Sequence, residues 1–244
     1  MIKMDLKTIK RQIEEEYKYR IELHAHTKPT SLCSEITPKE MVDIYKELGY
    51  DAVTITNHFS YYETEMDKEE YIDFFMNDFL ETEKYGKEKG MKVYLGAEIR
   101  FTENYNDYLV FGVNKKMLGE IYDLLPFGVE HFRENYSMPE SLFIHAHPKR
   151  KSATAIEPHL VDGIEVFNMH PGHNSGIGLA ALQAKDEGHR IITAGSDFHH
   201  HDRNHEGLGA IRTKYIPEDN FELAKLLKSG DYLLEIARGM IVLA

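Results

Sequence analysis

Cysteine is almost absent from this sequence, since Cys33 is the only one among 244 residues. A single thiol cannot form an intrachain disulfide, and it excludes a zinc site built from several cysteines. A metal site in this chain must therefore use histidine and carboxylate ligands. Long apolar stretches are also missing, and the first 20 residues are too rich in Lys, Arg and Glu for a signal peptide. We therefore expect a cytoplasmic protein without a membrane partner.

Positive charge is scarce as well. The chain has 29 Lys and Arg residues against 41 Asp and Glu residues, which gives a formal net charge of −12. This excess repels polyanions at long range, so we expect a small substrate rather than a nucleic acid. The sequence contains no Gly-x-Ser-x-Gly elbow, no Walker loop and no dinucleotide fingerprint, which argues against three large enzyme classes. Nothing in the sequence indicates an oligomeric state.

The apolar pattern predicts an α/β protein. Residues 1–19 carry apolar side chains at helical spacing and are predicted to form a helical extension, and residues 20–244 are predicted to form one domain. Strands are predicted at 20–24, 52–56, 92–97, 108–113, 142–145, 163–167 and 190–194, and helices at 38–48, 68–89 and 178–187. Alternating strands and helices over about 250 residues favour a mainly parallel sheet that closes into a barrel.

Histidine is abundant, with 14 residues that gather in clusters. Many of them, together with carboxylates, come directly after a predicted strand, and the carboxyl ends of barrel strands converge on one face. Residues two apart on a strand point to the same side, so pairs such as His24 and His26 can share one ion. The candidate metal ligands are His24, His26, His58, Glu98, His147, Asp197 and His199.

Seven ligands are too many for one tetrahedral ion and suit two or three ions, with Glu98 as a bridge. A mixed set of imidazoles and carboxylates suits Zn, Mn or Fe(II) better than Ca or Mg, which prefer oxygen ligands. The chemistry that uses such a cluster is hydrolysis, in which two ions about 4 Å apart hold a bridging hydroxide and orient a phosphate. The sequence therefore predicts a metal-dependent phosphoesterase.

These residues resemble the motifs of the PHP family, named for polymerase and histidinol phosphatase domains. Residues 22–27 (ELHAHT) are similar to its opening Asp-x-His-x-His-Thr, and residues 55–58 (ITNH) are similar to Ile-Thr-Asp-His. Residues 96–98 (GAE), 146–148 (AHP) and 195–199 (GSDFH) complete the series. The resemblance runs from about residue 22 to about residue 209. It implies a distorted TIM-like (β/α)7 barrel, a dinuclear or trinuclear metal cluster and phosphoester substrates.

Three positions differ from the family pattern. Asn57 stands where the family usually has Asp, so a supporting carboxylate or substrate contact is missing. Asp107 occupies the region in which the family often has a His, which makes Asp107 a further candidate ligand. Residues 31–34 (SLCS) replace the usual Ser-Asp-Gly, so a ligand of the second ion is missing unless Cys33 replaces it.

Several residues beside the cluster are candidates for other roles. Arg150 follows His147 closely, and its planar guanidinium suits a substrate phosphate. His170 lies in a loop on the same side, and we expect it or His173 to donate a proton to the leaving oxygen. His145 is expected to fill a layer of the barrel.

The main hypothesis is hydrolysis of a small phosphomonoester, as in a histidinol phosphatase or a nucleotide phosphatase. The alternative is a metal-binding PHP module with an exonuclease-like role, or a non-catalytic module that binds nucleic acid or protein. A third possibility is an amidohydrolase-type barrel, which also begins with His-x-His but lacks the motifs around His58 and His147.

Overall fold

The computed structural model describes residues 5–61, 66–201, 208–237 and 239–243. Parts of the predicted extension and domain (residues 1–4 and 244) lie outside this range. The helices are α1 (Leu6–Glu16), α2 (Pro38–Glu47), α3 (Lys68–Lys89), α4 (Lys115–Leu124), α5 (Gly128–Asn135), α6 (Ile177–Glu187) and α7 (Asn220–Ser229), with 3-10 turns η1 (Leu125–Phe127) and η2 (Pro158–Leu160). The strands are β1 (Tyr19–Ala25), β2 (Ala52–Ile55), β3 (His58–Ser60), β4 (Lys92–Arg100), β5 (Asp107–Phe111), β6 (Leu142–His145), β7 (Gly163–Asn168), β8 (Ile192–Gly195), β9 (Ala210–Thr213), β10 (Leu233–Ile236) and β11 (Met240–Val242).

Local capping explains where the long helices begin and end. The Thr37 side chain accepts the amide of Glu40, whose carboxylate bonds back to Thr37, so α2 begins with a capping box. Asp67 and Glu70 form the same arrangement at the start of α3. Helix α3 ends at Gly90, which adopts the left-handed conformation that a side chain would disfavour. These observations confirm the predicted bounds of both helices.

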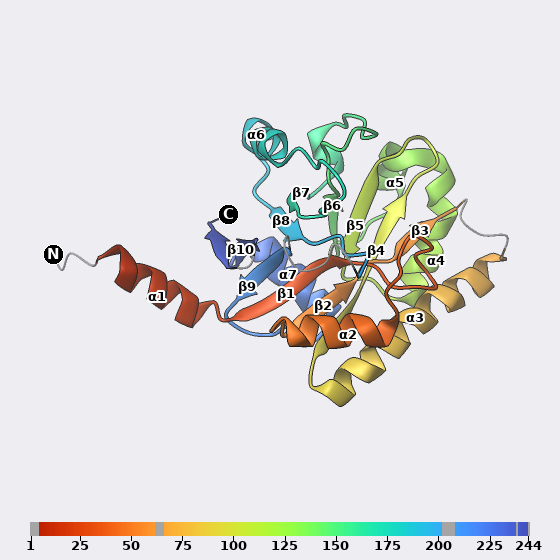
Figure 1. Ribbon diagram of the computed structural model, residues 1–244. Coiled ribbons are helices and arrows are strands. Elements are labelled where there is room, and N and C mark those ends of the chain that lie inside the picture. Colours follow the sequence, from red (N-terminus) through yellow and green to blue (C-terminus); the bar gives the residue numbers. More distant parts are fainter. Residues whose placement is uncertain (1–4, 62–65, 202–207, 238, 244) are drawn as a thin grey trace.

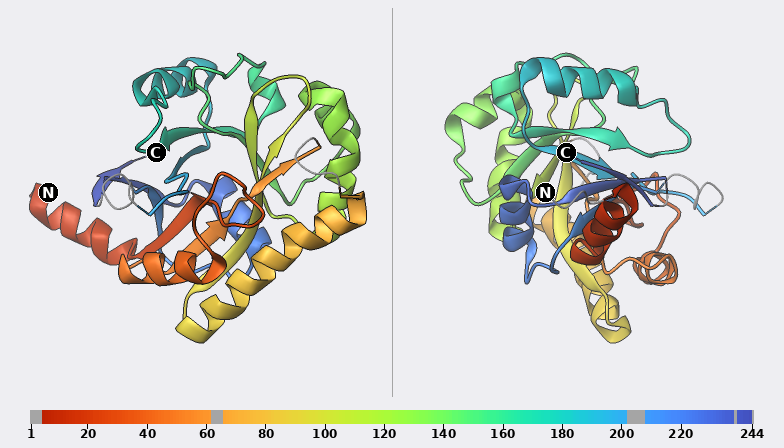
Figure 2. Two further views of the ribbon diagram at one scale, coloured as in Figure 1. Left: turned by 45° about the vertical axis from the view of Figure 1, so that its right-hand side comes forward. Right: turned by 90° about the vertical axis from the view of Figure 1, so that its left-hand side faces the viewer.

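The strands form one strongly curled sheet in the order β11-β10-β9-β1-β2-β4-β5-β6-β7-β8, with β3 paired to β4. Figures 1 and 2 show it as an incomplete barrel with helices α2 to α6 on its outside. The backbone of residues 197–198 closes the gap to β1, because Asp197 donates its amide to His24 and His26 donates its amide to Phe198. The predicted single α/β domain with a distorted barrel is confirmed.

The sheet is mixed rather than mainly parallel. Strand β5 runs antiparallel to both β4 and β6, and β9 runs antiparallel to β1 and β10. Residues 101–106 are too few for a crossover, so β4 and β5 form a hairpin. The expectation of a mainly parallel sheet was therefore wrong in these two regions, because the apolar pattern of a strand does not encode its direction.

Two apolar clusters lie on opposite faces of the sheet. The cluster on the inner face contains side chains of β1, β5 and β6 together with α7. The cluster on the outer face contains side chains of the strands packed against α2, α3, α4 and α5. Tyr71, Phe75 and Phe79 of α3 are buried in the outer cluster, as the helical spacing predicts. The helix α1 projects from the domain in Figure 1 and contacts it near its end, where the Tyr17 hydroxyl lies 2.7 Å from Asp231. The apolar layers leave the strand ends free to carry polar side chains.

Candidate metal centre

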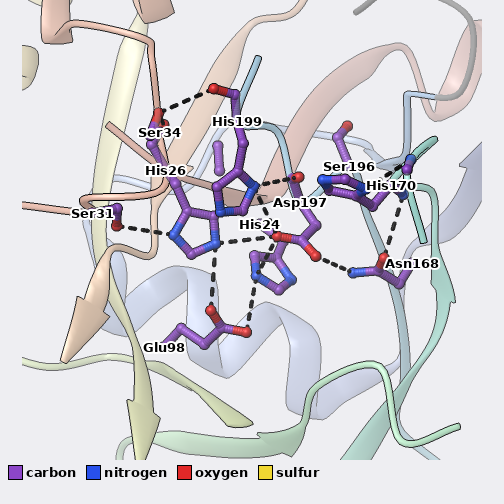
Figure 3. A network of polar contacts seen from close by, with 12 residues as sticks. His24, His26, Ser31, Ser34, Glu98, Asn168, His170, Ser196, Asp197 and His199 are labelled. Carbon is purple, nitrogen blue, oxygen red and sulfur yellow. Dashed lines mark hydrogen bonds and ion pairs between the residues drawn. The ribbon is translucent and has the colours of Figure 1, made fainter. Parts of the chain in front are cut away.

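The carboxyl ends of the strands gather polar side chains at one end of the curled sheet (Figure 3). All seven side chains predicted as metal ligands meet there, and Asp107 joins them. They form four groups, and within each group the ligand atoms lie within 4.8 Å of one another. The groups are His26 with His58 and His199, His24 with His26 and Asp197, His24 with Glu98 and His147, and His58 with Glu98 and Asp107.

His24 presents one ring nitrogen to the centre of the cluster. Its Nδ1 lies 2.9 Å from the Glu165 carboxylate, which fixes the ring and favours a proton on Nδ1. Its buried Nε2 has no hydrogen-bond partner among the described residues, and it lies 3.3 Å from Glu98 and 3.5 Å from Asp197. This geometry suits a neutral imidazole that binds a cation through Nε2.

The ring of His26 is oriented in a similar way, by a contact of its Nδ1. Its Nδ1 lies 3.1 Å from the Ser31 hydroxyl, and its Nε2 lies 3.3 Å from Asp197 and 3.5 Å from Glu98. This Nε2 is also buried and without a hydrogen-bond partner in the described part of the chain. Buried polar atoms are normally paired, so two such nitrogens facing carboxylates fit a site for metal ions.

Glu98 lies between the groups. Its two oxygens lie 2.9 Å from His147 Nε2 and 2.9 Å from His58 Nδ1, on opposite sides of the carboxylate. The strand pairing accounts for part of this position, because residue 58 of β3 is aligned with residue 98 of β4. Glu98 is therefore placed to share its oxygens between neighbouring ions.

The pKa shifts in the cluster come from the close approach of opposite charges. Burial raises the pKa of Asp197, but the charges of His24 and Arg150 outweigh burial and hold this pKa well below its usual range. Burial lowers the pKa of His24, but the carboxylates of Glu165, Asp197 and Glu98 raise this pKa well above its usual range. Asp197 is thus ionised at neutral pH, as a carboxylate that binds a divalent cation must be.

Two of the candidate ligands adopt a backbone conformation that is rare for residues other than glycine. The φ angle is 29° at His147 and 51° at Asp197. Such strain persists only where surrounding contacts stabilise it, and it concentrates at functional sites. Here the amide of His147 bonds to Glu165 at 3.0 Å and that of Asp197 bonds to the carbonyl of His24 at 2.8 Å.

Arg150 and Arg100 each bind a carboxylate of the cluster. The Arg150 guanidinium contacts Asp197 and lies 3.1 Å from Asn168, and Arg100 binds Asp107 through two contacts of 2.7 and 2.8 Å. Both arginines line a cavity of about 620 Å³ that borders His147. Arg150 therefore lies where the cluster and the cavity meet, and its predicted contact with substrate stays a prediction.

His170 lies beside the cluster, with its ring centre 5.6 Å from that of His199. The amide of Gly172 donates to His170 Nδ1 at 2.9 Å, so the proton of the neutral ring is on Nε2. Burial lowers the pKa of His170 to about 4. At neutral pH this side chain is thus a neutral hydrogen-bond donor. His173 is close to it, with ring centres 4.4 Å apart.

The prediction for His145 was wrong. Its ring stacks on Tyr108, which packs with Phe143 in the outer apolar cluster, so His145 does not fill a layer of the barrel interior. Strand β6 ends at His145, and the unusual backbone of His147 breaks the alternation that would place both rings on one side. Cys33 belongs to none of the four groups. Burial raises the pKa of its thiol, but hydrogen bonds with His199 and His58 bring this pKa to about 6.

Sequence reasoning assigned no role to two buried carboxylates that support the ligands. Glu165 contacts His24, and Glu22 accepts the amides of Leu23, His24 and Ser196 at 2.8 to 3.0 Å. Glu22 thus ties β1 to the segment that carries Asp197. The signal in the sequence was the presence of a carboxylate within an apolar strand, which is rare unless the charge is paired.

A sequence model of the PHP domain matches residues 22–238. The chain belongs to the PHP domain family. No curated protein matches the chain. The motifs that resembled this family are the same segments that supply the ligands, so the resemblance and the geometry agree.

Several solved structures share the fold of this chain at low sequence identity. PsfC from Pseudomonas syringae has a TM-score of 0.61 at 16% identity, over 93% of this chain and 91% of that one. A two-domain protein from Bacteroides vulgatus, containing a predicted PHP-like metal-dependent phosphoesterase, has a TM-score of 0.58 at 14% identity. That match covers 90% of this chain and 65% of the other, so the chain spans less than two thirds of the two-domain protein. A candidate metal-dependent phosphoesterase from Bifidobacterium adolescentis has a TM-score of 0.50 at 14% identity, with 85% and 96% covered.

Proposed function

We propose that this PHP protein is a metal-dependent phosphoesterase that hydrolyses a small phosphomonoester. The observation that carries the proposal is the convergence of four ligand groups around Glu98, beside a cavity of about 620 Å³. Two similar solved structures are described as predicted metal-dependent phosphoesterases, which supports this reaction class but not the choice of a phosphomonoester.

The proposed cofactor is two or three divalent ions of Zn, Mn or Fe, because imidazole nitrogens and carboxylates are mixed in every group that includes Glu98 or Asp197. When bound, such ions lower the pKa of water to produce a hydroxide nucleophile and neutralise the charge of a phosphate. His24, His26, His58, His147 and His199 would hold these ions through imidazole nitrogens. Glu98, Asp197 and Asp107 supply the negative charge.

The remaining polar groups of the chain orient the substrate. Arg150 is fixed by Asn168 and Asp197 at the edge of the cavity, so its guanidinium can bind a phosphate oxygen without a large movement. His170 contributes the hydrogen on Nε2, which in the neutral ring can bond to the leaving oxygen. Because the pKa of His170 is lowered to about 4, it acts by donating a hydrogen bond and is not a charged acid at neutral pH.

The cavity and the charge of the protein favour a small substrate. Arg100, Arg150 and Lys151 line the cavity, and these charges suit one or two phosphate groups rather than a strand. The net charge of −12 opposes binding of a polyanion. In the described residues no helix is both long and apolar enough to cross a bilayer.

A direct comparison of substrates tests the proposal. The protein is loaded in turn with Mn, Zn and Fe(II), and hydrolysis of a set of phosphomonoesters is compared with degradation and binding of a short single-stranded oligonucleotide. We expect faster turnover of a phosphomonoester. The rival module that binds nucleic acid instead requires tight binding of the strand, weakened steeply by salt, with little turnover of small esters. That second result would overturn the proposal.

A further inference from the structure

A buried polar network lies behind His26, on the side away from the metal centre. It contains Thr27, Ser31, Asn57 and Asp78, and all four side chains are buried. Asp78 is part of α3 and belongs to none of the four ligand groups. Figure 3 shows the first link of this network, the contact between Ser31 and His26. Asn57 is the position at which the sequence differs from the usual aspartate of the family.

The contacts of Asn57 determine which way its amide points. The backbone amide of Thr27 lies 2.7 Å from one side-chain atom of Asn57, and because an amide N–H only donates, that atom is the oxygen. The nitrogen therefore faces the Asp78 carboxylate at 2.8 Å and the Thr27 hydroxyl at 2.9 Å. The Thr27 hydroxyl in turn donates to Asp78 at 2.7 Å. Every donor in this part of the network has an acceptor.

The direction of these bonds extends to His26. The Ser31 hydroxyl lies 3.0 Å from the Asn57 oxygen, which only accepts, so Ser31 donates its one proton there. The Ser31 oxygen then accepts from the backbone amide of His58 at 3.0 Å and from His26 Nδ1 at 3.1 Å. Nδ1 must therefore carry the proton of the neutral ring. The lone pair is left on Nε2, the atom that faces Asp197 and Glu98.

We propose that Asn57 and Asp78 are positioning residues that act as a pair, fixing His26 as the tautomer able to bind metal through Nε2. In this pair Asn57 supplies an amide and Asp78 supplies a carboxylate. An aspartate at position 57 would instead supply a carboxylate itself. An aspartate at position 57 would face Asp78 at about 2.8 Å, and two carboxylates this close cannot both be ionised in a buried site. A carboxylate at position 57 thus requires a neutral partner at position 78.

Exchanging the two residues should preserve the network. In the double variant N57D/D78N, the new amide nitrogen at position 78 can donate to the carboxylate at 57 and to the Thr27 oxygen. The Thr27 hydroxyl then donates to position 57, and the contacts with Ser31 and the Thr27 amide are unchanged. In D78N alone, the new amide oxygen can accept from Asn57 and Thr27, so this variant should be affected only mildly. In N57D alone, the two carboxylates can be satisfied only by sharing one proton, and taking up that proton at neutral pH costs stability.

The test is a double-mutant cycle with N57D, D78N and N57D/D78N, measured at one neutral pH. We expect N57D to melt roughly 5–15 °C lower and to bind Zn²⁺ about 10–100-fold more weakly in competition with a chelator. The double variant should recover most of both losses. N114D is the matched control, because Asn114 is an exposed helix cap at which Asp serves equally well. Ring ¹⁵N spectra of the metal-free protein should show the proton of His26 on Nδ1 in wild type and in the double variant.

Three results would overturn the inference. They are an N57D variant as stable and as tightly metal-binding as wild type, a double variant no better than N57D, and a His26 proton on Nε2 in the wild type. If N57D does not fold, recovery of folded protein by D78N in the double variant is the rescue that the inference requires. The inference rests on the proposed metal centre. A wild type that binds zinc and behaves as expected in the cycle, but hydrolyses no phosphomonoester, would refute only the proposed substrate.

Discussion

Gly195, the last residue of β8, leaves room for His24, and replacing it by alanine should disturb the metal centre. A Cβ atom at position 195 would lie 2.5 Å from the Cβ of His24, 2.8 Å from the Glu165 carboxylate and 3.3 Å from the His24 amide nitrogen. Carbon atoms in contact are normally about 3.5–4.0 Å apart. The Glu165 carboxylate could rotate away, but the other two atoms are the Cβ and the amide nitrogen of His24, whose positions are set by the backbone of β1. Strand β1 or β8 must therefore move by about 1 Å.

The expected loss of stability follows from the lack of space for this Cβ atom. Forcing a methyl group into a packed core costs about 1–3 kcal/mol, and each kcal/mol lowers the melting temperature of a domain of this size by about 2–4 °C. We therefore expect G195A to melt about 2–12 °C lower than wild type. The same shift moves His24 away from Glu98 and Asp197 and breaks its contact with Glu165. Loss of such a supporting contact typically weakens metal binding about 10–100-fold.

G178A is the matched control, because a Cβ at Gly178 meets no atom within 4 Å and this residue lies in the first turn of α6. Alanine is the better helix former by up to about 1 kcal/mol, so G178A should melt at or above the wild-type temperature and bind metal normally. The assay is thermal unfolding of both variants together with zinc binding in competition with a chelator. If G195A matched G178A in both measurements, the argument from close packing at His24 would be refuted.

Four further results are expected. The purified protein should retain at least two equivalents of transition metal by elemental analysis, and less than half an equivalent without recovery on adding metal would contradict the cluster. H26A and D197A should each abolish hydrolysis and keep a cooperative melting transition, and wild-type rates in both would show the ligands to be wrong. E165Q should weaken metal binding about 10–100-fold, because it removes the charged acceptor of His24 Nδ1. The pKa values of His24 and His58 are raised in the metal-free site, so metal must displace protons from these rings and its affinity should rise from about pH 6 to about pH 8. An affinity that is flat over this range would contradict the cited shifts.

The strand ends and the ligands could be predicted because both depend on local patterns. An apolar run followed by His24, His58 or Asp197 marks a strand that ends in a polar side chain, and parallel strands bring such ends together. Capping residues such as Thr37 and Gly90 similarly mark the helix bounds. These signals depend only on residues that are neighbours in the sequence, so they can be recognised without knowledge of the tertiary structure.

Strand direction and side-chain orientation could not be predicted in this way. The hairpin of β4 and β5 and the outward position of His145 depend on how distant segments pack. The role of Arg150 is a further example, because its contact with Asp197 joins residues 47 positions apart. A sequence pattern places such a residue near the site but does not say which partner it binds.

The sequence by itself determined that any metal site in this chain must use histidine and carboxylate ligands, since Cys33 is its only thiol and these residues follow apolar strands. Only the tertiary structure decided which nitrogen of His26 faces Asp197 and Glu98. The other nitrogen faces Ser31, which is joined by a hydrogen bond to Asn57, 26 positions away in the sequence. The direction of each hydrogen bond depends on contacts between residues that are distant in the sequence, and the pattern of residue types along the chain does not specify those contacts.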